Sequence, residues 1–145
     1  MDDPKRLLVM KLTAIGRLLW LSFNQSAERI GVTQAKWTLI AAVARNPGAT
    51  QRSIASALHV TDVTAGRLID RLCEDGYIER RENPDDRRSY RVYLTPAARP
   101  VLDRLREIAA AHTDEAFAGL DDKDMEKLGA LLDVISRNVG AVRGQ

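Results

Sequence analysis

The sequence is poor in the residues that most often build disulfide frameworks, metal centres and catalytic sites. It has one cysteine, which excludes an intramolecular disulfide, and its two histidines, His59 and His112, are too few and too isolated for a structural zinc site. Neither histidine belongs to a local Ser-His-Asp or Cys-His pattern, and no glycine-rich phosphate-binding motif is present. We therefore expect no catalytic residues, no metal, no cofactor and no enzymatic activity.

The sequence also lacks a long apolar run and a recognisable signal peptide. A membrane-spanning helix needs about 18 or more consecutive apolar residues, and no such run is present. The apolar-rich stretch from Leu7 to Phe23 is interrupted by Lys11, Thr13 and Arg17, so we interpret it as an amphipathic helix. These features predict a cytoplasmic protein without a membrane partner.

Length and composition are those of one domain-sized globular chain. The protein has 145 residues, 45% of them hydrophobic, and we expect a single domain over residues 1–145. The net charge of +2 is too small to argue for a nucleic-acid partner by itself. Its distribution is more informative, because the segment 100–145 is acidic and is not expected to contact nucleic acid.

The segment 51–95 has the order helix, tight turn, helix, strand, polar loop, strand. Thr50 and Thr61 are good N-caps for the two helices, and only two residues separate the end of the first helix from the second cap. Together with the preceding helix, this order predicts a winged helix-turn-helix over residues 33–95, within a fold that is mainly α with a small β-wing. Such a unit typically binds duplex DNA.

The second of these helices has two different faces. One is apolar and is expected to pack on the core; it consists of Ala65, Leu68, Ile69 and Leu72. The other carries Val63, Gly66, Arg67, Asp70 and Arg71. A mid-helix glycine costs roughly 1 kcal/mol relative to alanine, which favours a close approach, such as that of a groove wall. A plain solvated face is the alternative.

Individual side chains on the polar face suggest base contacts. Arg67 has the reach to bind guanine or a phosphate, and Val63 could contact a thymine methyl group. Asp70 is unfavourable near phosphates unless it accepts a hydrogen bond from cytosine or pairs with Arg67 or Arg71.

The two predicted strands, 77–81 and 91–95, flank a loop with turn chemistry at Asn83-Pro84-Asp85. Five arginines fall between positions 80 and 91, and arginine suits the narrow, strongly negative minor groove. Asp86 precedes Arg88 by two residues, so we expect its carboxylate to hold that guanidinium in an extended pose. The alternative for such a loop is a charged sheet edge that resists aggregation.

These patterns predict DNA contacts from the start of the first helix, where it would cross the phosphate backbone, from the second helix and from the wing. The predicted residues are Thr50, Gln51, Ser53, Thr61, Asp62, Val63, Thr64, Gly66, Arg67, Arg71, Arg87 and Arg88, with Asp86 orienting the wing.

The outer segments 5–29 and 96–142 are predicted to be dimerisation helices. The first has an apolar stripe, Thr95 and Pro96 suit the N-cap and first position of another helix, and a last helix is expected to begin near Asp121. Their apolar stripes exceed what the short 51–95 unit could cover. We therefore favour a two-fold homodimer with interleaved terminal segments, and packing within one chain is the alternative.

The chain resembles the MarR (multiple antibiotic resistance regulator) family of bacterial transcription factors. The likeness is carried by GVTQAKW at 31–37, NPGATQRSIASAL at 46–58 and VTDVTAGRLIDRLCEDGYIERRENPDDRRSYRVYLT at 60–95. The D-x-R of the family wing falls on Asp86 and Arg88. Arg17, Trp20, Trp37 and LTPAARP at 94–100 resemble the SlyA-like members, whereas Ala98 departs from the glycine of many relatives.

This resemblance implies a homodimer bound to a near-palindromic operator and a small aromatic or phenolic effector between the dimer helices and the DNA-binding unit. Arg17, Trp20 and Trp37 are the candidate effector-binding residues, with plain core packing of the two tryptophans as the alternative. Cys73 lies near acidic residues and a helix C-terminus, both of which raise a thiol pKa and disfavour a redox role.

Three functions agree with these features to different degrees. The first is a ligand-responsive dimeric regulator, in which we expect a repressor. The second is a constitutive architectural DNA binder, and the third is a winged-helix module for protein contacts. The basic wing and the Gly66-Arg67 face favour the first two, because a protein interface would require neither.

Overall fold

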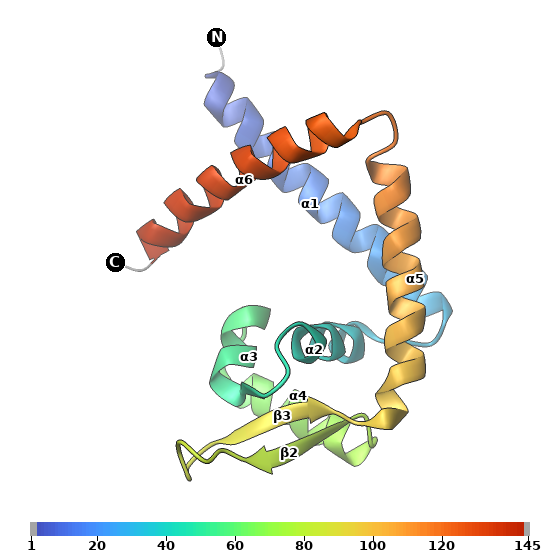
Figure 1. Ribbon diagram of the computed structural model, residues 1–145, viewed down its shortest axis with the longest axis vertical. Helices are drawn as coiled ribbons and strands as arrows, with labels where there is room; N and C mark the ends of the chain where they lie inside the picture. Colours follow the sequence, from blue (N-terminus) through green and yellow to red (C-terminus); the bar gives the residue numbers. More distant parts are fainter. Residues whose placement is uncertain (1–2, 144–145) are drawn as a thin grey trace. The chain divides into compact units, whose positions relative to one another are not determined.

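The computed structural model describes residues 3–143, and the chain divides into two compact units, Met1–His112 and Thr113–Gln145. The boundary falls within a helix, and the two units are described separately. The first unit begins with two helices and continues into a three-stranded sheet with two short helices (Figure 1). Its elements are α1 (Pro4–Arg29), α2 (Gln34–Arg45), β1 (Ala49–Thr50), α3 (Gln51–Leu58), α4 (Asp62–Glu74), β2 (Ile78–Glu82), β3 (Tyr90–Leu94), the 3-10 turn η1 (Pro96–Ala98) and most of α5 (Arg99–Ala116).

Threonine caps begin three of these helices. Thr33, Thr50 and Thr61 each have extended backbone and accept a hydrogen bond through the side-chain oxygen from the amide three residues on. The capping distances are 3.3, 3.2 and 3.1 Å, and each bond satisfies an amide that lacks a partner within its helix. The helix starts expected at Thr50 and Thr61 are therefore confirmed, and so is the mainly α fold with a small β-wing.

The sheet is antiparallel with the order β1-β3-β2, so β3 is its central strand. Val92 of β3 lies opposite both Ala49 of β1 and Arg80 of β2, and it is almost fully buried. Each wing strand lies one residue away from the bounds predicted from the sequence, and β1 was not predicted. A strand of two residues is too short to show the alternating pattern by which strands are recognised.

The core of the first unit lies between the helices and the sheet. Leu39, Ile40 and Val43 of α2 are fully buried there against Ile54 of α3 and Ile69 of α4. The predicted inward face of α4 is thus largely confirmed: Ala65, Ile69 and Leu72 are buried, and Leu68 is half-buried at the edge of the same cluster. The opposite face of α4 is left to solvent.

Thr95 occupies the expected N-cap position before Pro96, but its side chain bonds elsewhere. Its hydroxyl donates to the carbonyl of Gly76, and its amide donates to the carbonyl of Tyr77 at 3.0 Å, so Thr95 ties the end of β3 to the turn after α4. No side-chain cap begins the following turn, and the 3-10 turn η1 stands between Thr95 and α5. The N-cap position predicted for Thr95 is confirmed, but the side chain makes no capping bond because its hydroxyl bonds to Gly76 instead.

The second unit contains the end of α5 and α6 (Asp122–Arg143). Gly119 has a φ of +90°, a left-handed conformation that favours glycine and separates the two helices. Asp121 accepts from the amide of Asp124 at 2.8 Å, and Asp124 accepts from the amide of Asp121 at 3.1 Å. This reciprocal capping confirms the helix start that was predicted near Asp121.

Large apolar side chains are exposed along both α1 and α6. On α1 they are Leu7, Leu8, Val9, Met10, Leu12, Ile15, Leu18, Leu19, Trp20 and Leu21, and on α6 they are Met125, Leu131, Leu132, Val134, Ile135 and Val139. By length and composition α1 is also long and apolar enough to cross a membrane, a test that core helices of soluble proteins and signal sequences pass as well. An exposed apolar surface of this extent indicates that α1 and α6 contact a partner.

Candidate nucleic-acid interface

Helix α4 presents a polar face whose side chains are exposed. Thr61, Asp62, Val63 and Thr64 form its exposed first turn, and Val63 has 65% of its surface accessible. Arg67, Asp70 and Arg71 follow on the solvent side of the helix. The structure therefore brings together the α4 residues expected to contact DNA, with the exception of Gly66.

Gly66 faces α3 within the protein, which corrects the expectation that it leaves room for a groove wall. A Cβ atom at this position would lie 2.9 Å from Nε2 of Gln51. That Nε2 donates to the backbone carbonyl of Asp62 at 2.9 Å and so links the start of α3 to the first turn of α4. The glycine thus permits close packing of the two helices, and the amide of Gln51 is already partly used inside the chain.

Three of the five wing-segment arginines have partners within the protein. Arg80 pairs with Asp70 of α4, and Arg91 pairs with Asp85 at 2.9 Å. Arg81 pairs with Glu79 at 2.6 Å, and its guanidinium lies 4.2 Å from the ring centroid of Tyr93. Asp70 would repel phosphates if it were unpaired, and its pair with Arg80 of β2 offsets that negative charge. From the sequence, Arg67 and Arg71 were the partners considered.

The remaining two arginines, Arg87 and Arg88, are exposed at the tip of the hairpin. Among the side chains of residues 3–140 neither guanidinium has an ion-pair partner. Asp86 contacts Arg88 through the backbone, since its Oδ1 accepts from the Arg88 amide at 2.9 Å. The predicted bond from Asp86 to the guanidinium was wrong, because the carboxylate caps the turn and leaves the guanidinium free.

A groove of about 420 Å³ runs between the helix-turn-helix and the wing. One side is formed by Thr50, Gln51 and Arg52 at the start of α3 with Asp62 of α4, and the other by wing residues that include Asp86 and Arg88. Residues far apart in sequence therefore share one surface. Arg87 lies at a second hollow, on the wing itself, together with Tyr90.

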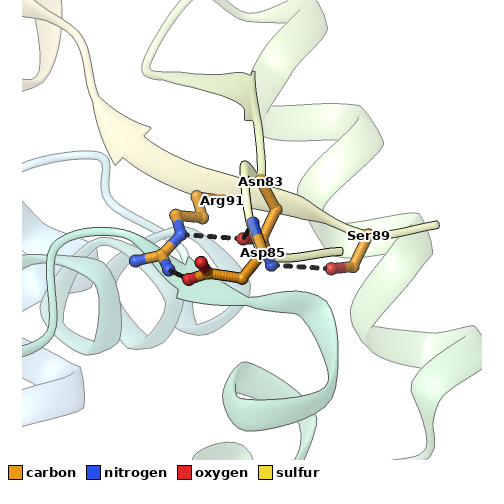
Figure 2. A network of polar contacts seen from close by, with 4 residues as sticks. All are labelled: Asn83, Asp85, Ser89 and Arg91. Atoms are coloured by element: carbon orange, nitrogen blue, oxygen red, sulfur yellow. Dashed lines mark hydrogen bonds and ion pairs between the residues drawn. The ribbon is translucent and has the colours of Figure 1, made fainter. Parts of the chain in front are cut away.

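Two residues at this surface were not selected from sequence. Arg52 is exposed and lines the groove, and its place one residue after Gln51 at the start of α3 was a usable signal. Asn83 is 8% exposed and bonds to three wing residues, Ser89, Asp85 and Arg91 (Figure 2). From the sequence Asn83 showed only a turn preference, because its partners are set by the loop conformation.

Cys73 is half-buried at the end of α4. Burial raises the pKa of its thiol, the Arg80 guanidinium acts in the opposite direction and Asp70 acts in the same direction as burial. The direction agrees with expectation, but the main cause is loss of solvent, whereas acidic neighbours and the helix terminus were expected to dominate. A protonated, half-buried thiol is a poor nucleophile.

The three candidate effector residues do not meet in either of the two hollows that border the tryptophans. Trp20 and Trp37 are neighbours, with ring centroids 5.9 Å apart, and the Trp37 indole donates to Asn24 at 2.8 Å. Trp20 borders a hollow beside the turn between α3 and α4, whereas Trp37 borders another between α2 and α5. Arg17 is exposed and borders neither.

The hollow beside Trp37 has cations of its own. Its volume is about 330 Å³, and its walls combine apolar side chains, including Phe23 and Leu102, with the exposed arginines Arg45 and Arg106. An aromatic ring flanked by guanidinium groups is a chemistry that suits an aromatic carboxylate. Neither arginine was selected from sequence, because only the fold brings α2 and α5 together.

The sequence of this chain is similar to those of known transcriptional regulators. The MarR family model matches residues 30–89, the segment from the end of α1 to the wing loop. A putative transcriptional regulatory protein for the hcr operon of Thauera aromatica is 30% identical over 115 residues, which cover 77% of this chain and 69% of that protein. The chain belongs to the MarR family. It is a winged-helix transcriptional regulator of the MarR type.

Solved MarR-type structures share the fold over most of the chain. A MarR-family regulator from Silicibacter pomeroyi is 28% identical with a TM-score of 0.76, and the match covers 90% of this chain and 87% of that one. The transcriptional regulator SlyA is 27% identical with a TM-score of 0.74, over 91% of this chain and 93% of its own. The SlyA match agrees with the SlyA-like features in the sequence of this MarR-family protein.

The contact between Gly66 and Gln51 predicts a background-dependent stability effect. In a Gln51→Ala background, Gly66→Ala should raise the free energy of unfolding by about 1 kcal/mol, because alanine is the better helix former. In the wild-type background the gain should be smaller, since the new Cβ displaces the Gln51 amide from Asp62. Urea unfolding at one fixed protein concentration measures both effects, and equal gains would contradict the contact.

Proposed function

We propose that this protein is a sequence-specific DNA-binding regulator that acts as a homodimer on a near-palindromic operator. The observation that carries the proposal is the division of the wing arginines: three are paired within the protein, and Arg87 and Arg88 are exposed without an ion-pair partner among the described residues. Free guanidinium groups on a projecting hairpin suit a polyanionic groove.

The geometry supports different DNA contacts for α4, for the start of α3 and for the wing. Helix α4 would enter the major groove, where Arg67 and Val63 meet base edges and Arg71 meets the backbone. The α3 start, with Thr50, Gln51 and Ser53, would face phosphates, as would the first turn of α4 with Thr61, Asp62 and Thr64. Arg87 and Arg88 would follow the adjacent minor groove.

The homodimer is supported by the uncovered apolar surface of α1 and α6. The exposed side chains include Leu8, Met10 and Leu18 on α1 and Leu131 and Val139 on α6, each more than half accessible. Burial of this surface against a second copy would contribute about 25 cal/mol per Å² of apolar area. A two-fold dimer would present two α4 helices to one face of DNA, about one helical turn apart.

The proposal includes regulation of DNA binding by a small effector. The hollow beside Trp37 would take a small aromatic or phenolic anion, held by Arg45 and Arg106. The hollow lies between α2, which belongs to the DNA-binding unit, and α5, which follows that unit. A ligand bound there would therefore change the position of the DNA-binding unit relative to α5. The effector releases DNA only if it binds the released arrangement more tightly. In this proposal the protein is a cytoplasmic repressor that the effector removes from its operator.

The two other functions make different predictions for the same surface. A constitutive architectural binder would use the wing without preferring a base sequence and would not respond to a ligand. A module for protein contacts would not need unpaired arginines at a hairpin tip.

The wing assignment predicts a salt-dependent loss in one variant. Arg88→Ala should weaken binding to duplex DNA and lower the slope of log K against log salt by about one unit, because one phosphate-neutralising charge is removed. Titration at several salt concentrations measures the slope. Arg104→Ala is the matched control, since it removes the same charge from exposed surface on α5. Wild-type affinity of Arg88→Ala at every salt concentration would remove the wing from the interface.

The role of Arg67 is tested by base preference. Arg67→Ala should relax the preference at one position of each half-site by roughly 1–3 kcal/mol, the value of one bidentate base contact. Competition binding with single-base operator variants gives this number. If the preference stays unchanged while affinity falls uniformly, Arg67 contacts a phosphate.

The effector hollow is tested with salicylate, a small aromatic carboxylate. Salicylate should change tryptophan emission saturably and weaken operator binding over the same concentration range. Arg106→Ala should weaken salicylate binding by about tenfold or more, because a charge-assisted hydrogen bond is lost. Arg104→Ala again serves as control. Identical salicylate binding by wild type and Arg106→Ala would place the ligand elsewhere.

A further inference from the structure

Asn83 is the one buried polar or charged residue within residues 3–140, whose side chains the structure describes. It stands immediately after β2, at the start of the loop 83–89 that joins the two wing strands. Burying a primary amide is costly unless its hydrogen-bonding groups are satisfied. No buried side-chain nitrogen or oxygen among the described residues lacks a partner, so the amide of Asn83 is both buried and bonded.

The bonds of Asn83 join the two ends of the wing loop. Its Nδ2 donates to Oγ of Ser89 at 3.0 Å, while its Oδ1 accepts from the amide of Asp85 at 3.1 Å and from Nε of Arg91 at 3.3 Å (Figure 2). Arg91 also donates from Nη2 to Asp85 at 2.9 Å. Asn83, Asp85 and Arg91 thus close a ring of contacts at the base of the loop, and Ser89 is joined to this ring through Asn83.

The backbone bonds of the loop continue from this ring to the wing tip. The carbonyl of Asn83 accepts from the amide of Asp86 at 3.2 Å, and the carbonyl of Asp86 accepts from the amide of Ser89 at 3.3 Å. The Asp86 side chain accepts from the amide of Arg88. The backbone on both sides of Arg87 and Arg88 is therefore held, although their guanidinium groups are free.

We infer that Asn83 is a positioning residue for DNA binding, which fixes the loop so that Arg87 and Arg88 project from it. This inference rests on the proposed function. An arginine carried by a fixed loop loses less conformational freedom on binding than one carried by a mobile loop, so affinity is gained without a further contact. Asn83 itself need not touch DNA.

The primary test is the affinity of Asn83→Ala for operator DNA. The variant removes all three side-chain bonds, and we expect binding about tenfold weaker with a lower salt slope, because the wing arginines no longer contact phosphates in a fixed pose. Asn24→Ala is the matched control. Asn24 is a half-buried asparagine that likewise bonds to another element, and its partner Trp37 is away from the wing. We expect its affinity and slope to match wild type.

A double-mutant cycle separates positioning from general destabilisation. In the Arg87→Ala/Arg88→Ala background, Asn83→Ala should cause no further loss of affinity, because the groups it positions are gone. A full, additive tenfold loss in that background would overturn the inference. Duplex binding that depends on Arg87 and Arg88 but is unchanged by Asn83→Ala would also overturn it, and would leave the proposed function intact. Absence of duplex binding by wild type would refute the proposed function.

Ser89→Ala keeps the test decisive if Asn83→Ala fails to fold. This variant removes only the bond from Nδ2 of Asn83, so we expect a smaller loss of affinity for operator DNA than with Asn83→Ala. We also expect faster hydrogen exchange of the backbone amides of Asp86 and Ser89, which bond within the loop. Faster exchange accompanied by wild-type affinity and salt slope would overturn the inference, because a loosened loop would then bind DNA equally well.

Discussion

The central strand β3 is the constraint on which the rest of the DNA-binding unit depends. Val92 is buried at the point where β3 pairs with both neighbours, β1 on one side and β2 on the other. Because β1 leads directly into α3 and β2 leads into the wing loop, pairing with one strand places the helix-turn-helix and the wing relative to each other. The Gln51–Asp62 bond and the Asp70–Arg80 pair then attach α4 to this frame.

Charge at the proposed DNA surface is arranged by pairing within the chain. Carboxylates on such a surface repel phosphates, and three of them here have cationic partners: Asp70 pairs with Arg80, Asp85 with Arg91 and Glu79 with Arg81. Exposed pairs of this kind contribute little stability. The pairing leaves Arg87 and Arg88 as the wing arginines without an ion-pair partner among the described side chains, on a loop held from within by Asn83.

Sequence predicted what is encoded locally and missed what depends on the fold. Helix starts at Thr50, Thr61 and Asp121 follow from capping chemistry, and the buried face of α4 follows from its period. Strand β1 was missed because two residues have no period. The partner of Asp70 lies on another element ten residues away, and the space at Gly66 is filled by α3. Local pattern contains no information on such contacts.

Selection of binding sites from a random duplex library, followed by titration of the recovered sites at two salt concentrations, tests sequence-specific binding by a dimer most directly. We predict a near-palindrome with half-site centres about 10 bp apart, because a two-fold dimer would place two α4 helices one DNA turn apart. Weak, sequence-independent binding with a steep salt dependence would contradict the proposal, since it would leave only the electrostatic attraction of the wing arginines for phosphates.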